Sequence, residues 1–236
     1  MSLKDIIQSR RIDVEKLLEI LVKKIEKVLT NNEMPAFITV SYWSFSELKP
    51  YIHFRIINNN DKNKINKFIE NLLKLIKDEN FSLTQYIIEK NIKKNLLFKL
   101  NQDNNDSFYN QLGYIKEDER VIINKILELH KEFLKDIIEI IYFIPLKSFI
   151  TTQPIIGVLV VNTSCEYDDE VLSMVELFAK ALFASIHETE FEYLITSHAL
   201  RSAVAAIMAR NMSHNIGSHV LNYLSNPEEL DNLWII

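Results

Sequence analysis

The spacing of apolar and charged positions along the chain predicts several amphipathic helices. In residues 13–29, apolar side chains recur every three or four positions with charged side chains between them, as on a helix with one buried face. The same spacing predicts helices over residues 65–76 and 117–135, and a long helix that begins at Asp168. Residues 81–100 have an ambiguous period, so the pattern assigns them no element.

Two pairs of short segments have the composition of β-strands. Residues 36–43 and 51–57 are rich in β-branched and aromatic side chains and flank a turn at Pro50, which predicts two paired strands. Residues 138–146 and 155–162 predict an antiparallel hairpin in the same way. Together with the helices, these strands predict an α+β fold in which an antiparallel sheet is flanked by helices.

The last predicted helix is unusually long. No glycine or proline interrupts residues 158–216, so a continuous helix over residues 168–224 is expected, about 85 Å long at 1.5 Å per residue. Its second half has apolar positions on more than one face at spacings of three and four, which is typical of a multi-helix bundle. We therefore expect a parallel homodimer through this helix. The alternative is a core helix that packs only within its own chain.

The end of the second hairpin strand carries a family resemblance. The segment over residues 154–162 reads PIIGVLVVN and is followed by an acidic helix start. A last strand with glycine followed by aliphatic residues, then a helix that runs towards an output module, resembles the C-terminal half of a GAF sensor domain. The resemblance spans residues 10–187 and is most specific over 138–187. It implies a GAF-like antiparallel sheet flanked by helices, with a PAS-like sensor as the alternative.

A sensor domain implies a ligand pocket. Aromatic-rich, apolar concavities over a sheet are common ligand sites. The candidate lining residues on the predicted strands are Tyr42, Trp43, His53 and Tyr142. The alternative is that these side chains are ordinary core residues.

A second resemblance lies near the C-terminal end. Residues 211–221 read NMSHNIGSHVL, which resembles the H-box of two-component sensor histidine kinases. The matching positions are Asn211, Met212, Ser213, His214 and Ile216, and the departures are Asn215, Gly217, Ser218 and His219. The resemblance implies that His214 is a phosphoacceptor. It also implies that Asn215 stands where the family has a carboxylate, and that Ser218 stands where related kinases position a water for phosphatase action.

The residue types fit phosphoryl transfer in part. A neutral imidazole can attack the γ-phosphate of ATP through one nitrogen while a neighbour holds the other. Asn215 can accept a hydrogen bond but cannot take up a proton, so a general-base role for it stays open. His214 and His219 can also be ordinary polar positions on a bundle helix. They are five residues apart and therefore about 140° apart around the helix, so no zinc site is expected.

These observations predict a domain organisation and a function. Residues 1–187 form a GAF-like sensor domain, and residues 188–236 form a signalling helix and the start of a dimerisation and histidine phosphotransfer domain. The chain has three glycines and ends at Ile236, so the glycine-rich ATP-binding domain of such a kinase is missing. ATP and Mg²⁺ are expected only with that domain, and no cofactor is expected in this chain.

The chain is therefore predicted to be the N-terminal portion of a cytoplasmic sensor histidine kinase. Its partners would be an ATP-binding kinase domain and the receiver domain of a response regulator. The alternative is a non-catalytic GAF-type module for ligand binding or dimerisation. A small-molecule enzyme has no support, because no nucleophile, base and orienting residue converge.

Composition restricts the function further. The net charge of −5 and the pI near 5.7 argue against a general nucleic-acid binder. Cys165 is the only cysteine and is expected in a loop after a strand, so no internal disulfide can form. The most apolar stretch, residues 137–161, is broken by charges, prolines and a glycine, and no signal peptide precedes the helices, so neither a membrane span nor export is expected.

Overall fold

The computed structural model describes residues 14–29, 35–44, 49–102, 105–147 and 155–225. The chain divides into two compact units. The first is Ile12–Phe191, and the second contains Met1–Arg11 and Glu192–Ile236.

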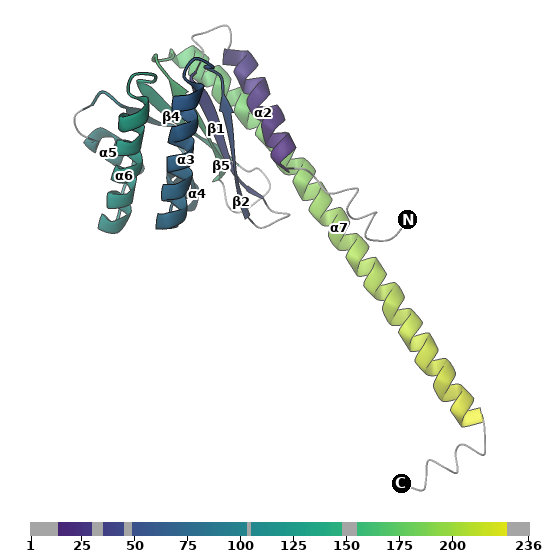
Figure 1. Cartoon of the computed structure of the whole chain (residues 1–236). Helices are drawn as coiled ribbons and strands as arrows, with labels where there is room; N and C mark the ends of the chain where they lie inside the picture. The colour runs from purple at the N-terminus through teal and green to yellow at the C-terminus, as the bar shows by residue number, and fades with distance from the viewer. Residues whose placement is uncertain (1–13, 30–34, 45–48, 103–104, 148–154, 226–236) are drawn as a thin grey trace. The chain divides into compact units, whose positions relative to one another are not determined.

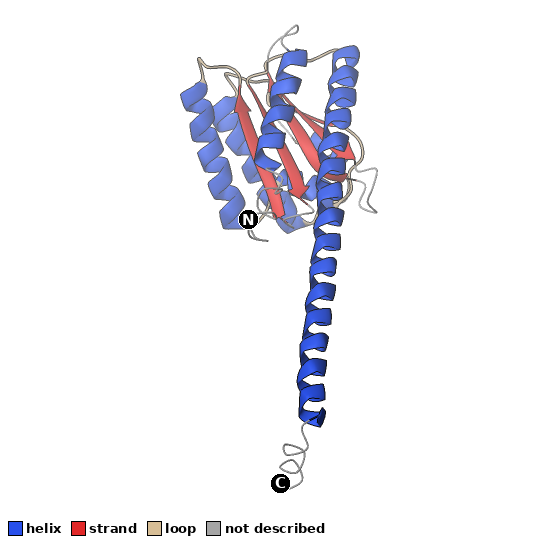
Figure 2. Ribbon diagram, turned by 90° about the vertical axis from the view of Figure 1, so that its right-hand side faces the viewer, coloured by secondary structure: helices blue, strands red, loops and turns tan. Residues whose placement is uncertain are grey.

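The first unit is built on one five-stranded sheet (Figures 1 and 2). The strands follow the order β2-β1-β5-β4-β3, and each neighbouring pair is antiparallel. The strands are β1 (Phe37–Ser44), β2 (Lys49–Ile56), β3 (Leu96–Lys99), β4 (Ile140–Lys147) and β5 (Ile155–Thr163). The helices are α2 (Val14–Leu29), α3 (Lys62–Glu79), α4 (Leu83–Glu89), α5 (Asp106–Leu112), α6 (Glu117–Leu134) and the first part of α7 (Asp169–Ser225).

Helices cover both faces of this sheet. Helices α3, α4, α5 and α6 pack on one face, here called the α3–α6 face. Helix α2 and the first turns of α7 pack on the other, the α2/α7 face. Because successive strand residues point to opposite sides, Phe37 of β1 belongs to the first core and Ile38 to the second. Both faces of the central strands are therefore buried.

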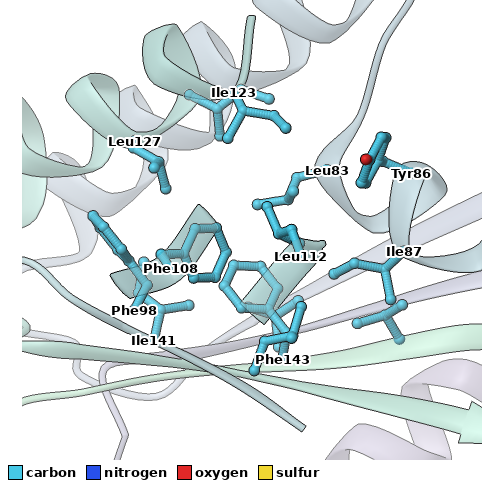
Figure 3. Close-up of a cluster of buried hydrophobic side chains, with 14 of the residues drawn as sticks. Leu83, Tyr86, Ile87, Phe98, Phe108, Leu112, Ile123, Leu127, Ile141 and Phe143 are labelled. Carbon is cyan, nitrogen blue, oxygen red and sulfur yellow. The ribbon is translucent and has the colours of Figure 1, made fainter. Parts of the chain in front are cut away.

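The core of the α3–α6 face contains a group of aromatic rings (Figure 3). The ring of Phe108, from α5, lies 5.3 Å from that of Phe98 on β3 and 5.7 Å from that of Phe143 on β4, measured between centroids. Leu112, Ile123 and Leu127 are buried in the same cluster. Aromatic pairs at these distances add to the free energy of burial.

On the α2/α7 face, α7 comes close to the sheet at Gly157. A Cβ atom at residue 157 would lie 2.7 Å from Cζ of Phe183 and 2.8 Å from the backbone oxygen of Ser41. The ring of Phe183 is fully buried and meets Tyr42 edge-on, with 5.0 Å between centroids. A glycine at this position leaves the space that the Phe183 ring fills.

The described part of the second unit is the remainder of α7, which is one continuous helix of 57 residues from Asp169 to Ser225. Several of its large apolar side chains are exposed, including Ile207, Met208, Met212 and Ile216. A soluble helix with apolar groups on this scale is normally covered by a partner.

The predicted α+β fold, its antiparallel sheet with flanking helices, and the long C-terminal helix are confirmed. Three features differ from the sequence analysis. Pro50 lies inside β2, paired with Trp43, and not in a turn. An edge strand tolerates proline near its start, because the missing N–H is not needed there. The unassigned residues 81–100 form α4 and β3, and α5 was not predicted.

The remaining predictions about the hairpin turn, the domain boundary, Cys165 and membrane spans compare with the structure as follows. The turn of the second hairpin falls outside the described residues. The predicted domain boundary after residue 187 falls within α7. Cys165 follows β5 in a loop, as expected. Among the described helices, none combines the length and the hydropathy that a membrane span requires.

Candidate functional site

A groove opens on the α3–α6 face where β1 and β2 meet α3 and α4. It has a volume of about 340 Å³. Its lining residues come from these four elements and from the N-cap position of α4, and are Ser41, Tyr42, Trp43, Pro50, Ile52, Ile76, Ser82, Thr84, Gln85, Ile88 and Glu89. We call this space the outer groove. Its walls are mainly apolar, as in most small-molecule sites.

A second, smaller space lies deeper against the sheet. This inner cavity has a volume of about 50 Å³. It shares five lining residues with the outer groove, namely Ser41, Ile52, Ile76, Ser82 and Thr84. The remaining wall is formed by Phe37, Thr39, Phe54, Phe68, Leu72, Leu83, Ile126, His130, Phe143, Val160 and Asn162. The shared residues make the two spaces neighbours in a single site.

A chain of hydroxyl groups stands where the two spaces share their wall. The hydroxyl of Ser41 donates to Thr84 Oγ1 at 2.9 Å, and the hydroxyls of Ser82 and Thr84 are 2.8 Å apart. This chain links β1 to the start of α4. The hydroxyls are therefore engaged with one another.

His130 is the titratable group of the inner cavity. It is buried on α6, its ring lies 4.6 Å from the ring of Phe68, and its Nδ1 is 2.7 Å from the backbone oxygen of Ile126. Burial lowers the pKa of His130 from 6.5 to about 4, and the hydrogen bond to Ile126 opposes this shift only in part. The imidazole is therefore neutral at pH 7.

The four residues predicted to line a ligand pocket do not lie on the same side of the sheet. Tyr42 and Trp43 line the outer groove, whereas His53 and Tyr142 line neither space. The strand period explains only part of this result. Tyr142 belongs to the core of the α2/α7 face, and His53 pairs with Val40, which has the same orientation. Tyr42 belongs to that core as well, although it borders the groove, so Trp43 is the one of the four on the α3–α6 side. The hydroxyl of Tyr142 accepts a hydrogen bond from the backbone N–H of Tyr167, and burial raises its pKa.

Most of the lining residues were not predicted from the sequence, and two of them carried a signal. His130 follows Ile126 by four positions, and Asn162 follows Val160 by two, so each is a polar residue at a position where the local period predicts an apolar one. A polar side chain on a buried face often marks a site, and this signal was present in the sequence.

The H-box segment lies on the described part of α7. His214 and Asn215 are exposed, and the hydroxyl of Ser218 donates to the backbone oxygen of His214 at 2.8 Å. That bond returns to the preceding helical turn, so the Ser218 proton is not directed towards an external group in this conformation. The side chain of His219 lies outside the described set. No group of three potential metal ligands is found among the described residues.

Comparison with known proteins gives the following. No protein-family model matches the chain, and a search of curated proteins gives no match. Among solved structures, a domain of a presumed two-component sensor histidine kinase from Sinorhizobium meliloti 1021 is similar at 13% identity and a TM-score of 0.42, over 79% of this chain and 99% of that one. A GAF domain/HD domain protein from Geobacter sulfurreducens is similar at 11% identity and a TM-score of 0.42, over 76% and 95%.

The GAF3 domain of a protein from Synechocystis sp. PCC6803, in its photoproduct state, is similar at 10% identity and a TM-score of 0.44, over 78% of this chain and 99% of that one. The first unit has an α+β fold: five antiparallel strands flanked by helices on both faces, with helix α7 following the last strand.

Proposed function

We propose that the chain is the N-terminal portion of a two-component sensor histidine kinase. The first unit would bind a small ligand in the outer groove and inner cavity, and α7 would carry His214 as the phosphoacceptor. A cytoplasmic location follows from the need for ATP. The partners in this proposal are an ATP-binding kinase domain and the receiver domain of a response regulator.

The observation that carries the proposal is the position of His214. It is an exposed histidine on α7, the same continuous helix whose first turns pack on the sheet of the first unit. The residues before it, Asn211, Met212 and Ser213, match the H-box. On an ideal helix His214 is about 200° from Met212 and Ile216, so a partner could cover those apolar groups while the imidazole stays accessible.

Phosphoryl transfer to His214 requires few groups from this chain. A ring nitrogen of His214 attacks the γ-phosphorus, a P–N bond forms, and the P–O bond to the departing ADP breaks. The imidazole then loses its remaining N–H proton to solvent or to a base on the ATP-binding domain. Asn215 can orient the ring through its amide oxygen, but it cannot be that base. The Mg²⁺ and the groups that hold the nucleotide would come from the ATP-binding kinase domain.

A second copy of the chain is the partner that we propose for α7. After Phe191, its exposed large apolar side chains among the described residues are Leu194, Ile195, Leu200, Ile207, Met208, Met212 and Ile216. Leu200 and Ile207 are seven residues apart, and Met208, Met212 and Ile216 follow one another at intervals of four, which suits a parallel bundle. Light scattering on the purified chain should give twice the 27.7 kDa chain mass. A monodisperse monomer at tens of micromolar would exclude this dimer.

Phosphoryl transfer in trans tests the proposal. The chain should label with radioactive phosphate only when a cognate ATP-binding fragment and ATP are supplied. The label should be acid-labile, retained in His219→Gln and lost in His214→Gln. Label that persists in His214→Gln would show that another residue is the acceptor.

The second candidate is a non-catalytic ligand-binding and dimerisation module. Two observations favour it: Asn215 replaces the carboxylate, and Ser218 is hydrogen-bonded within its own helix. The same assay separates the two candidates. If the chain binds a ligand and dimerises, but never labels beside an active cognate fragment, the second candidate replaces the first.

A further inference from the structure

The side chain of Asn162 has an unusual environment. It is 1% exposed, lies on β5 and lines the inner cavity. Its Nδ2 donates to the backbone oxygen of Phe37 at 3.4 Å, whereas its Oδ1 has no hydrogen-bond partner among the described residues. Flipping the amide would set Oδ1 against the Phe37 oxygen, so the hydrogen-bond network favours the present orientation. A buried acceptor without a partner destabilises a fold, so its presence here calls for a reason.

His130 supplies a second acceptor to the same cavity. The backbone oxygen of Ile126 can only accept, so Nδ1 of His130 carries the ring proton and donates it. Since the buried imidazole is neutral, its other nitrogen, Nε2, is an acceptor. The inner cavity is therefore bordered by two side chains that can accept a hydrogen bond.

The other residues that line the two spaces disfavour a charged ligand. No charged side chain is among the described residues that line the inner cavity, and Glu89 is the single one along the outer groove. The hydroxyls of Ser41, Ser82 and Thr84 already bond to one another. An anion here would lose its water and gain hydroxyl donors at most, with no cation in return, which is costly.

We infer that this site takes an uncharged, mainly apolar ligand that carries an O–H or N–H donor at its buried end. The donor bonds to Oδ1 of Asn162, the buried acceptor without a partner among the described residues. The inner cavity, at about 50 Å³, admits only that end, and the apolar body lies in the 340 Å³ outer groove against Trp43 and Ile52. Leu83 and Phe143, both labelled in Figure 3, close the inner cavity from α4 and β4. The inference rests on the proposed ligand-binding role of the first unit.

Three probes of similar size test the charge and the donor separately. Phenol, toluene and benzoate are titrated into the 236-residue chain at pH 7.5 and followed by ligand-observed NMR. Phenol and toluene should bind and benzoate should not. Benzoate binding as tightly as phenol overturns the inference. Failure of phenol to bind at millimolar concentration also overturns it, but leaves phosphorylation of His214 to its own assay.

A pair of variants on β5 tests the contact itself. Asn162→Leu removes the acceptor, and the ratio of phenol to toluene affinity should fall roughly tenfold, the scale of one hydrogen bond. Thr163→Val is the matched control. It changes the next residue, a buried threonine that lines neither space, and should leave the ratio unchanged. If toluene binds and Asn162→Leu leaves the ratio intact, the groove binds ligands but the donor contact is refuted.

A direct measurement covers the case in which Asn162→Leu does not fold. The side-chain amide resonances of Asn162 in the unchanged protein should shift on addition of phenol, and by less on addition of toluene. Equal shifts with both probes would refute the contact.

Discussion

Replacement of Gly157 by alanine tests the close packing of α7 on the sheet. The added methyl group would lie 2.7 Å from the Phe183 ring and 2.8 Å from the backbone oxygen of Ser41. Neither atom can move freely, since Phe183 is fully buried against Tyr42, and the Ser41 oxygen belongs to a strand paired on both sides. The methyl group therefore forces the helix or the strand to shift.

The expected size follows from two opposing effects. Overpacking of a core costs about 1–3 kcal/mol, and exchange of glycine for alanine returns about 0.4–1 kcal/mol by restricting the unfolded chain. The net loss should be about 1–2 kcal/mol, which lowers Tm by roughly 2–8 °C for a unit of this size. Far-UV circular dichroism during heating or urea titration measures the loss.

Two further variants make the result specific. Gly217→Ala is the same chemical change on α7 at a position with no atom within 4 Å of the added methyl group, so it should not lower Tm. In a Phe183→Leu background, the cost of Gly157→Ala should shrink, because one of the two clashes is gone. An unchanged or raised Tm in Gly157→Ala would refute the close packing, and an equal cost in both backgrounds would refute the role of Phe183.

Three other outcomes are expected. Lowering the pH from 7.5 to 5 should reduce the free energy of unfolding by about 2 kcal/mol through His130. The pKa of His130 is about 4 in the folded chain and 6.5 in the unfolded chain, so the unfolded state takes up the proton first as the pH falls. This part of the loss should be absent in His130→Gln, and equal pH profiles for the two proteins would refute it. Asn215→Asp should raise the rate of His214 phosphorylation by up to roughly a hundredfold if a missing base limits it, as measured by initial rates of labelling. Gly217→Ala should increase the helix content of α7 in circular dichroism, since alanine is favoured over glycine by about 1 kcal/mol in a helix interior; unchanged ellipticity would contradict this.

The sequence was sufficient where local pattern decides the structure. The run without glycine or proline predicted α7 almost to the residue, and the β-branched runs predicted β4 and β5. Local pattern failed where strand pairing determines the structure. Pro50 indicates a turn by itself, yet it is compatible with β2 because β2 is the edge strand, a fact set by the sheet order.

The candidate site shows the same division. Tyr42 and Trp43, two of the four aromatic or histidine residues predicted to line a pocket, border the outer groove. Of the four, Trp43 is the one on the α3–α6 side of the sheet, and local pattern could not single it out, since that requires knowing which side of each strand meets which helices. The sequence analysis also passed over Asn162 and His130, whose importance depends on a cavity that forms only when β5 and α6 are brought together.

The outer groove and the first turns of α7 lie on opposite faces of one sheet, which restricts how ligand binding in the proposed sensor could affect the helix. Ser41 lines the groove and the adjacent Tyr42 contacts Phe183 of α7 on the opposite face. Any signal from groove to helix must therefore cross a single layer of backbone, largely as a displacement of β1. Such a displacement is not carried by one side chain, so truncating groove residues one at a time should weaken ligand affinity more readily than it abolishes the response. Substitutions that alter the packing of the sheet against α7, such as those at residue 157, should impair the response more than they weaken ligand affinity.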